Sequence, residues 1–326
     1  MRAVVTGGAG FIGSHLIEAL VARGDEVVCV DREGASRQWI GHLDIPMRLH
    51  GLQNPDALAE SFAGADVVFH LAGLTAARRV ADFYTVNTEG TAHVMRAAGR
   101  QGDRAPRVVL ASSLAALGPN RNGELLGSDM VPRPLSHYGH SKLLAELMLH
   151  AWGDRVPGVV LRLAGVYGPR ECGVLKLFKL VRHGFALTIG PWGREVSLLY
   201  VSDLVQGFLR AATQPGVEGR TFCLAHPAPV SWRQFALEVG QVLGRRPRLI
   251  SLPRPVGRAI GAVAELVAAL GRQAAIVNRE KVLELMQRRW VCDVAPAVQH
   301  LGFRPAFPLA RGIAVTADWY RGMGWV

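Results

Sequence analysis

The first half of the chain alternates short apolar runs with segments whose apolar residues recur every three to four positions. Short β-branched runs are typical of buried strands, and the longer spacing is typical of helices packed along one face. The pattern predicts strands at residues 2–6, 26–30, 66–71, 108–111 and 159–163. It predicts helices at residues 14–22, 57–62, 88–100 and 136–151. Because strands alternating with helices form parallel sheets covered on both faces, we expect a doubly wound α/β domain.

The alternation becomes irregular after Gly165, where glycines and prolines are frequent. The remaining pattern predicts strands at 197–201 and 221–224 and helices at 256–270 and 309–320. We expect residues 1–165 to form a Rossmann domain, with returning segments near 197–224. Residues 166–196 and 225–326 would form a smaller C-terminal substrate-binding lobe, packed closely on the first because no low-complexity linker separates them.

Composition limits the classes of function. The 326 residues carry a formal net charge of +11, and 49% of them are hydrophobic, which is enough for a folded core. A basic chain can bind nucleic acid, an anionic membrane surface or an anionic ligand. No long Lys/Arg run with interleaved aromatic residues occurs, and the densest arginine cluster, at 245–258, is broken by prolines. We therefore expect no nucleic-acid partner and at most a weak peripheral membrane contact.

The cysteines and the apolar segments indicate in which cellular compartment the protein is expected. The four cysteines form no C-x-x-C pair and have no histidine at metal-ligand spacing, so we expect free thiols and no metal site. Glycines and Glu18 interrupt the first apolar residues, so we expect no secretory signal peptide. The apolar stretch 259–270 contains Glu265 and is too short to span a bilayer. These features predict a soluble cytoplasmic protein.

The segment TGGAGFIG, at residues 6–13, lies between the first predicted strand and the first predicted helix. Gly7 allows a tight turn, Gly10 lets the backbone approach a pyrophosphate, and Gly13 allows the helix to pack closely on the strand. The helix start at Phe11 and Ile12 directs unpaired N–H groups and a partial positive charge at phosphates. The segment therefore predicts a nicotinamide-dinucleotide-binding enzyme.

The type of dinucleotide depends on two neighbouring residues at the end of the second strand. Asp31 is the expected acceptor for the adenosine ribose diol, and its carboxylate repels a 2′-phosphate, which favours NAD. Arg32 follows directly and could instead hold a 2′-phosphate, so NADP stays open.

Tyr138 and Lys142 are four residues apart in a predicted helix, which places both side chains on one face. A free tyrosine has a pKa of about 10 and is a poor base near neutral pH. A nearby ammonium stabilises the phenolate, so we expect Lys142 to lower the pKa of Tyr138. The tyrosine could then exchange a proton with a substrate alcohol.

In company with the glycine segment, these residues resemble the extended short-chain dehydrogenase/reductase family, also called the NAD-dependent epimerase/dehydratase superfamily. The resemblance covers most of the chain and rests on blocks that occur in the family's order. These blocks are 6–13, VFHLAG at 68–73, VNTEGT at 86–91, ASS at 111–113 with Gly118, Tyr138 with Lys142, RLAGVYGP at 162–169 and YVSDL at 200–204.

The resemblance implies roles for individual residues. Tyr138 would be the general acid/base, Lys142 would also bind the nicotinamide ribose, and Ser113 would hydrogen-bond the reacting oxygen. Ser112 could instead have a structural role, with its hydroxyl hydrogen-bonded to backbone groups at the end of the strand. Asn87 is either a helix cap or a residue that takes part directly in catalysis. The residues expected against the cofactor are Gly7, Gly10, Phe11, Ile12, Gly13, Asp31, Arg32, Leu71, Ala72, Gly73, Asn87, Ser112, Tyr138 and Lys142.

The chain departs from the family pattern where substrate is bound. Nucleotide-sugar members usually carry an arginine four residues before the tyrosine of the YVSDL-type block, to hold a diphosphate. That position is Val196, the nearest basic residue is Arg194, and the asparagine usual before Val166 is Gly165. The third-strand aspartate near adenine is also missing, since residues 50–54 offer glycine there. A buried diphosphate needs charged donors, and the position that usually supplies one is apolar in this chain. The sequence therefore argues against a nucleotide-sugar substrate.

These departures resemble the 3β-hydroxysteroid and sterol-4-carboxylate dehydrogenase-like branch. The leading hypothesis is a dehydrogenase or ketoreductase for a lipophilic, steroid- or sterol-like secondary alcohol or ketone, with decarboxylation if a β-keto acid forms. The alternatives are an NAD-dependent nucleotide-sugar epimerase/dehydratase and a non-catalytic NAD(P)-binding protein. The resemblance also suggests a homodimer built on the helix that bears Tyr138.

Overall fold

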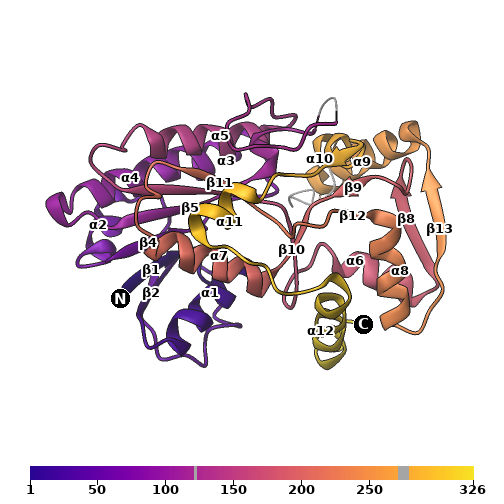
Figure 1. Ribbon diagram of the computed structural model, residues 1–326, viewed down its shortest axis with the longest axis horizontal. Helices are drawn as coiled ribbons and strands as arrows, with labels where there is room; N and C mark the ends of the chain where they lie inside the picture. Colours follow the sequence, from indigo (N-terminus) through magenta and orange to yellow (C-terminus); the bar gives the residue numbers. More distant parts are fainter. Residues whose placement is uncertain (121–122, 271–278) are drawn as a thin grey trace.

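The computed structural model describes residues 1–120, 123–270 and 279–326, and it is centred on a seven-stranded parallel sheet (Figure 1). Every strand pair in this sheet is parallel, as the alternation of strands and helices predicts. Across the sheet the strands are, in spatial order, β11 (Thr221–Leu224), β6 (Gly158–Leu163), β5 (Arg107–Ser113), β4 (Val67–His70), β1 (Arg2–Thr6), β2 (Glu26–Asp31) and β3 (Met47–Leu49). This order confirms the predicted doubly wound Rossmann sheet.

Helices cover both faces of the sheet. On one face lie α1 (Phe11–Ala22), α7 (Val201–Thr213) and α11 (Ala295–Leu301). On the other lie α2 (Pro55–Phe62), α4 (Gly90–Gly99) and α5 (His137–His150). Within β1, Val5 packs on the first face and Val4 on the second, since successive strand side chains point to opposite faces.

The connections of this part contain short elements that the periodicity does not predict. They are α3 (Val80–Phe83), the π-helix Tyr84–Glu89 and the 3₁₀ turns Gly102–Arg104 and Leu114–Ala116. The predicted helix 88–100 is thus α4 preceded by a π-helix. The periodicity does not predict strand β3 either, because three residues, two of them exposed, carry no periodic signal.

A second hydrophobic cluster lies beyond the carboxyl ends of the central strands, on the right of Figure 1. Its strands are β7 (Gly165–Tyr167), β8 (Phe185–Ile189), β9 (Glu195–Val196), β10 (Leu198–Tyr200), β12 (Val230–Ser231), β13 (Arg248–Leu252) and β14 (Arg289–Trp290). Helices α6 (Leu175–Arg182), α8 (Trp232–Val242) and α12 (Leu309–Gly322) pack into this cluster, and α9 (Arg254–Leu270) and α10 (Arg279–Leu285) lie on the same side of the molecule. The predicted strand 197–201 is β10, which pairs with β7 and not with the central sheet.

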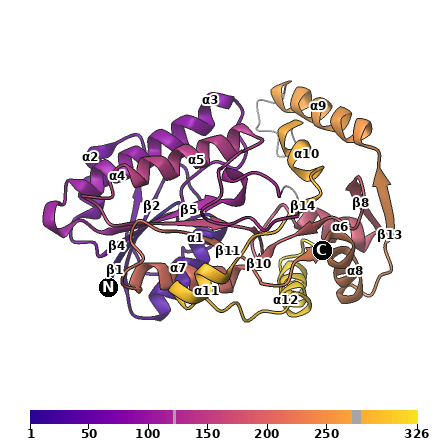
Figure 2. The same ribbon diagram turned by 45° about the horizontal axis from the view of Figure 1, so that its top comes forward.

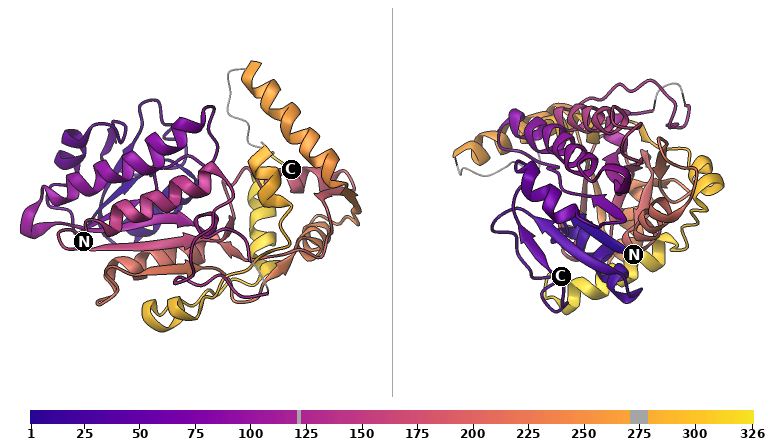
Figure 3. Two further views of the ribbon diagram at one scale, coloured as in Figure 1. Left: turned by 90° about the horizontal axis from the view of Figure 1, so that it is seen from above. Right: turned by 90° about the vertical axis from the view of Figure 1, so that its left-hand side faces the viewer.

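Helix α9 corresponds to the predicted helix 256–270, although the side chains of 266–270 lie outside the described residues. It forms a rod at the edge of the molecule, next to α10 (Figures 2 and 3). Within the described ranges, no helix has the length and apolar character needed to cross a membrane.

The cysteines are free thiols, and two of them meet. Cys223 and Cys292, distant in sequence, are buried in one small apolar cluster, where each thiol influences the pKa of the other. Among the residues with described positions, no cluster of three or more His, Cys, Asp or Glu side chains could hold a metal ion.

His70, at the end of β4, ties three elements of the sheet domain together. Its Nδ1 lies 2.7 Å from Thr6 Oγ1 and its Nε2 lies 3.0 Å from Thr91 Oγ1. Burial, assisted by the positive charge of Lys142, lowers the pKa of His70 to about 3. The imidazole is therefore neutral in the folded protein at every pH at which an unfolded histidine begins to protonate.

This gives a pH dependence of stability. Between pH 6.5 and about 3 the unfolded chain binds a proton at His70 that the folded chain refuses. The unfolding free energy should thus fall by up to about 1.4 kcal/mol per pH unit on acidification. Denaturant unfolding across this range should show a shallower slope for His70→Gln, whereas His42→Gln, at an exposed histidine, should keep the wild-type slope. Equal slopes for His70→Gln and wild type would contradict the assignment.

Candidate active site

The glycine segment between β1 and α1 is shaped by close backbone approaches. Gly7 has φ +71°, and a Cβ there would lie 2.7 Å from the backbone nitrogen of Ala72. A Cβ on Gly13 would lie 2.3 Å from the Gly7 carbonyl oxygen. Gly10 precedes α1 and its N–H donates to the Gly7 carbonyl at 3.1 Å. Gly7 and Gly13 admit only glycine because the loop folds back directly onto the helix start.

Among the described residues, no side chain caps the N-terminus of α1. Gly10 offers no side-chain cap, and the first turn, which includes Phe11 and Ile12, holds no acidic residue. Its N–H groups are therefore open to an anion, and the helix dipole favours one. This arrangement fits the pyrophosphate of a dinucleotide.

Asp31 is fixed beside this loop at the end of β2. Its Oδ2 accepts the Ala9 N–H at 3.0 Å, and its Oδ1 accepts the Arg32 N–H at 2.8 Å. The carboxylate therefore braces the glycine loop as well as standing where the ribose diol is expected. The side chain of Arg32 is exposed.

The segment after β4 forms the opposite wall. The Leu71 and Ala72 N–H groups donate to Thr6, to its carbonyl at 3.1 Å and its hydroxyl at 3.3 Å. A Cβ on Gly73 would lie 2.9 Å from Asn87 Oδ1 and 3.0 Å from Lys142 Nζ. Gly73 thus leaves room for both polar side chains.

Asn87 is not a helix cap, which corrects one of the two sequence interpretations. It lies inside the π-helix Tyr84–Glu89 and is 1% exposed. Its Oδ1 accepts the Leu74 N–H at 2.8 Å, and its Nδ2 donates to Ser141 Oγ at 2.9 Å. The side chain therefore connects the segment after β4 with the helix that carries Tyr138.

The structure brings Ser113, Tyr138 and Lys142 together at the carboxyl end of β5. The hydroxyls of Ser113 and Tyr138 lie close enough for Ser113 to influence the pKa of the phenol, and Ser113 Oγ accepts the Ala115 N–H at 3.1 Å. Tyr138 is partly buried, with the Phe83 ring centroid 6.1 Å away. Two hydroxyls meeting beside a buried ammonium form a site for proton exchange with an alcohol or ketone oxygen.

The protonation of Tyr138 differs from the sequence expectation. Removal from water raises the pKa of Tyr138 to about 12; the nearby Ser113 hydroxyl opposes this rise and the charge of Glu284 adds to it. The expected lowering of its pKa by Lys142 is wrong for this structure. The reason is that burial dominates the pKa of Tyr138 and the charge of Lys142 is not among the influences on it; Lys142 Nζ donates to the Ala111 carbonyl at 2.8 Å.

Lys142 is itself perturbed. It is 6% exposed, and burial lowers its pKa to about 8, against an opposing effect of the Glu146 carboxylate. Its ammonium points to the end of β5, adjacent to Gly73 and Asn87. This placement suits a group that holds the hydroxyls of a ribose.

Ser112 faces away from this site. Its hydroxyl donates to Glu146, which also forms a buried ion pair with Arg162 at 2.7 Å. Ser112 and Ser113 point to opposite sides of β5 because they are consecutive strand residues. The Ser112 side chain therefore binds this ion pair. It contacts neither the backbone groups that sequence analysis suggested nor the Tyr138 hydroxyl. Only the main-chain atoms of Ser112 remain available to contact a cofactor.

The start of α5 is held by two carboxylates that sequence reasoning missed. Glu284 Oε1 accepts the hydroxyl of Ser136, the N-cap of α5, at 2.5 Å. Glu280 Oε2 accepts the His137 N–H at 2.9 Å. The two glutamates are four residues apart on α10, and this i, i+4 spacing was the only available signal.

Val196 is buried in the second hydrophobic cluster, 7% exposed. Arg194, two residues earlier, is 5% exposed and donates to the Pro191 carbonyl and to Thr188 Oγ1. The family position of the diphosphate clamp therefore contributes an apolar contact.

The close contacts of the glycine loop lead to a testable prediction for NAD binding. Gly13→Ala should weaken NAD binding by about tenfold to a hundredfold, because the added methyl displaces the loop from the helix start. Titration calorimetry and the NAD-induced rise in Tm measure this. Gly322→Ala is the matched control, since its Cβ meets open space in α12. An unchanged dissociation constant in Gly13→Ala would refute the cradle.

A second prediction concerns Glu284. Since its negative charge contributes to the raised pKa of Tyr138, Glu284→Gln should lower the pKa of Tyr138 by about one unit or less. Alkaline titration of phenolate absorbance should detect the change. The shift must vanish in a Tyr138→Phe background; if it persists there, another tyrosine is responsible.

Comparison with known proteins agrees with this geometry. The model of the NAD dependent epimerase/dehydratase family matches residues 3–225. A ceramide reductase of Caulobacter vibrioides is 28% identical over 99% of this chain and 95% of its own length. A 4-hydroxy-2-methyl-3-oxo-4-farnesyl-3,4-dihydroquinoline-1-oxide ketoreductase of Stigmatella aurantiaca is 32% identical over 93% of this chain and 92% of its own.

Further relatives include enzymes named for a lipophilic alcohol and enzymes named for a nucleotide sugar. A 3-beta-hydroxysteroid dehydrogenase of Mycolicibacterium neoaurum is 27% identical over 98% of this chain and 90% of its own. The structure of UDP-glucose 4-epimerase from Thermus thermophilus, in complex with NAD, superposes with a TM-score of 0.79 at 25% identity over 99% of each chain. The chain therefore belongs to the NAD-dependent epimerase/dehydratase family and is an enzyme of the extended short-chain dehydrogenase/reductase type.

Proposed function

We propose that this enzyme transfers a hydride between NAD and the carbinol or carbonyl carbon of a lipophilic substrate. The observation that carries the proposal is the meeting of the Ser113 and Tyr138 hydroxyls at the end of β5, near the buried Lys142. The apolar burial of Val196, where nucleotide-sugar members carry arginine, supports a substrate without a diphosphate.

The relatives support the same class of substrate. The ceramide reductase and the farnesyl-quinoline ketoreductase both take their names from reduction of lipophilic compounds, and the steroid dehydrogenase is named for a lipophilic alcohol. We prefer a long-chain or polycyclic ketone to a sterol in particular, because the two relatives named first are not sterol enzymes.

Tyr138 can supply the proton that reduction of a ketone requires. A phenol whose pKa is raised to about 12 holds its proton at neutral pH, so Tyr138 donates that proton to the carbonyl oxygen. Ser113 hydrogen-bonds the same oxygen and positions it beside Tyr138. NAD, when bound in its reduced form, supplies the hydride for the carbonyl carbon. The glycine loop, Asp31 and Lys142 are the residues that would hold it, and Lys142 would bind the nicotinamide ribose.

Two further expectations stay predictions. The division into a cofactor domain and a substrate lobe at 165 and 197–224 is supported by the separate hydrophobic clusters, except that α11 and Phe303, expected in the lobe, pack on the sheet domain. A dimer built on α5 is supported by the exposed Leu144 and Leu147 on that helix, which are 36% and 51% exposed.

The stoichiometry of the cofactor tests the proposal. NADH should be consumed in equimolar amount with a long-chain 3-ketone such as 3-ketodihydrosphingosine or a 3-ketosteroid, and NADPH should be a poorer donor because Asp31 repels a 2′-phosphate. The epimerase alternative, favoured by a related structure that binds UDP-glucuronic acid and NAD, requires turnover of UDP-sugars without net NADH. That outcome would overturn the proposal.

A further inference from the structure

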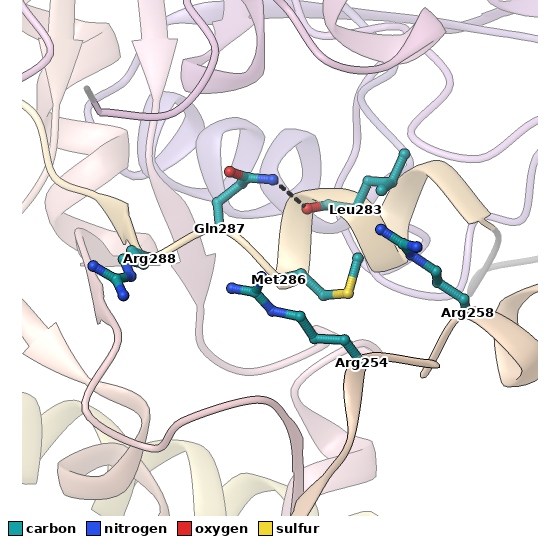
Figure 4. Close-up of a pocket in the computed structure, with 6 residues that line it drawn as sticks. All are labelled: Arg254, Arg258, Leu283, Met286, Gln287 and Arg288. Atoms are coloured by element: carbon teal, nitrogen blue, oxygen red, sulfur yellow. Dashed lines mark hydrogen bonds between the residues drawn. The ribbon is translucent and has the colours of Figure 1, made fainter. Parts of the chain in front are cut away.

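Between α9 and the end of α10 lies a cavity of ≈ 310 Å³ whose polar lining is basic (Figure 4). Three arginines, one glutamine and two apolar residues line it, and no carboxylate does. They are Arg254, Arg258, Leu283, Met286, Gln287 and Arg288. Arg254 and Arg258 occupy one face of α9, four residues apart, while the other four come from α10 and the residues that follow it.

The carboxylates of this region are engaged with other cations. Glu265 pairs with Arg279 at 3.2 Å, Glu195 with Arg289 at 3.1 Å, and Glu284 with Lys281 at 3.0 Å. Among the residues whose positions are described, Arg254, Arg258 and Arg288 take part in no ion pair. The cavity therefore carries positive charge that the protein does not neutralise.

A fourth arginine, Arg194, does not line the cavity but lies near enough to Arg254 to feel its charge. Arg194 is 5% exposed, and its Nη1 is buried without a hydrogen-bond partner in the described structure. Burial and the positive charge of Arg254 both lower the pKa of Arg194. A Cβ on Gly257 would touch Ile189, so the first turn of α9 rests on β8, whose Thr188 accepts from Arg194. Arg194 thus lies under the start of α9.

The start of α9 favours an anion as well. The helix runs for 17 residues and has no acidic side chain in its first turn, so its dipole adds partial positive charge at the end that carries Arg254. Guanidinium groups bind phosphate oxygens in bidentate geometry, which a chloride ion or a single carboxylate satisfies less well.

We propose that this cavity binds a phosphate-type oxyanion, carried either by a soluble phosphate ester or by a lipid headgroup. The arginines neutralise the phosphate oxygens, and Leu283 and Met286 contact the carbon chain of the ester. The site is separate from the glycine loop. Residues of α10 and of the segment after it line the cavity, and two other residues of α10, Glu280 and Glu284, accept hydrogen bonds from the start of α5. The inference does not depend on the reaction proposed above.

Binding can be measured directly on the protein saturated with NAD, which blocks the phosphate cradle at Gly7–Gly13. Inorganic phosphate and phosphatidylcholine vesicles with or without phosphatidic acid are the probes. Titration calorimetry should show saturable phosphate binding, and the double variant Arg254→Ala/Arg288→Ala should weaken it by at least about tenfold. Both arginines are exposed, so the variant should fold. Arg233→Ala, an exposed arginine on α8, is the matched control and should bind as wild type.

The vesicle arm identifies the source of the phosphate. Sedimentation with acidic vesicles that is lost in the double variant would assign a lipid headgroup, whereas binding of free phosphate alone would assign a soluble ester. The proposal is overturned if NAD-saturated protein binds neither probe. It is equally overturned if Arg233→Ala weakens binding as much as the double variant, because the effect would then be general surface charge.

Discussion

The buried ammonium of Lys142 is the group around which this site is arranged. A cation that is 6% exposed needs fixed acceptors, and it finds the Ala111 carbonyl at the end of β5 and the field of Glu146. Gly73 must lack a side chain for the ammonium to fit, and Asn87 fills the space beside it. The end of β5, the segment after β4 and the helix α5 are consequently held in one arrangement, and Tyr138 is placed by the same helix one turn earlier.

Two layers of polar contacts support this arrangement from behind. On the sheet side, Glu146 pairs with Arg162 and accepts from Ser112, so a carboxylate that influences Lys142 is itself fixed. On the side of the second cluster, α10 reaches the start of α5 through Glu284 and Ser136. The helix that bears Tyr138 is therefore held at its first turn by the substrate-side elements and along its length by the sheet. Movement of α10 would therefore displace the start of α5, which carries Tyr138.

Sequence patterns predict those parts of the fold and of the site that are determined by neighbouring residues. The βαβ units, the glycine loop and the spacing of Tyr138 and Lys142 follow from periodicity and from residue types that only one local geometry accommodates. Strands such as β9 and β14 are two residues long and have no period to detect. The pKa of Tyr138 escapes prediction because burial and Glu284, distant in sequence, outweigh a neighbour four residues away. Glu284 and the Arg254 cavity arise from tertiary contacts between segments whose own charge pattern is ordinary.

The central claim is that Tyr138 transfers the proton while the cofactor is held by other residues. The most direct measurement is the turnover of Tyr138→Phe on a ketone that the wild type reduces, together with its affinity for NADH. The account predicts a fall in kcat of about a hundredfold or more, with an unchanged dissociation constant for NADH, since the phenyl ring retains the packing against Phe83. Wild-type turnover in Tyr138→Phe would contradict the account.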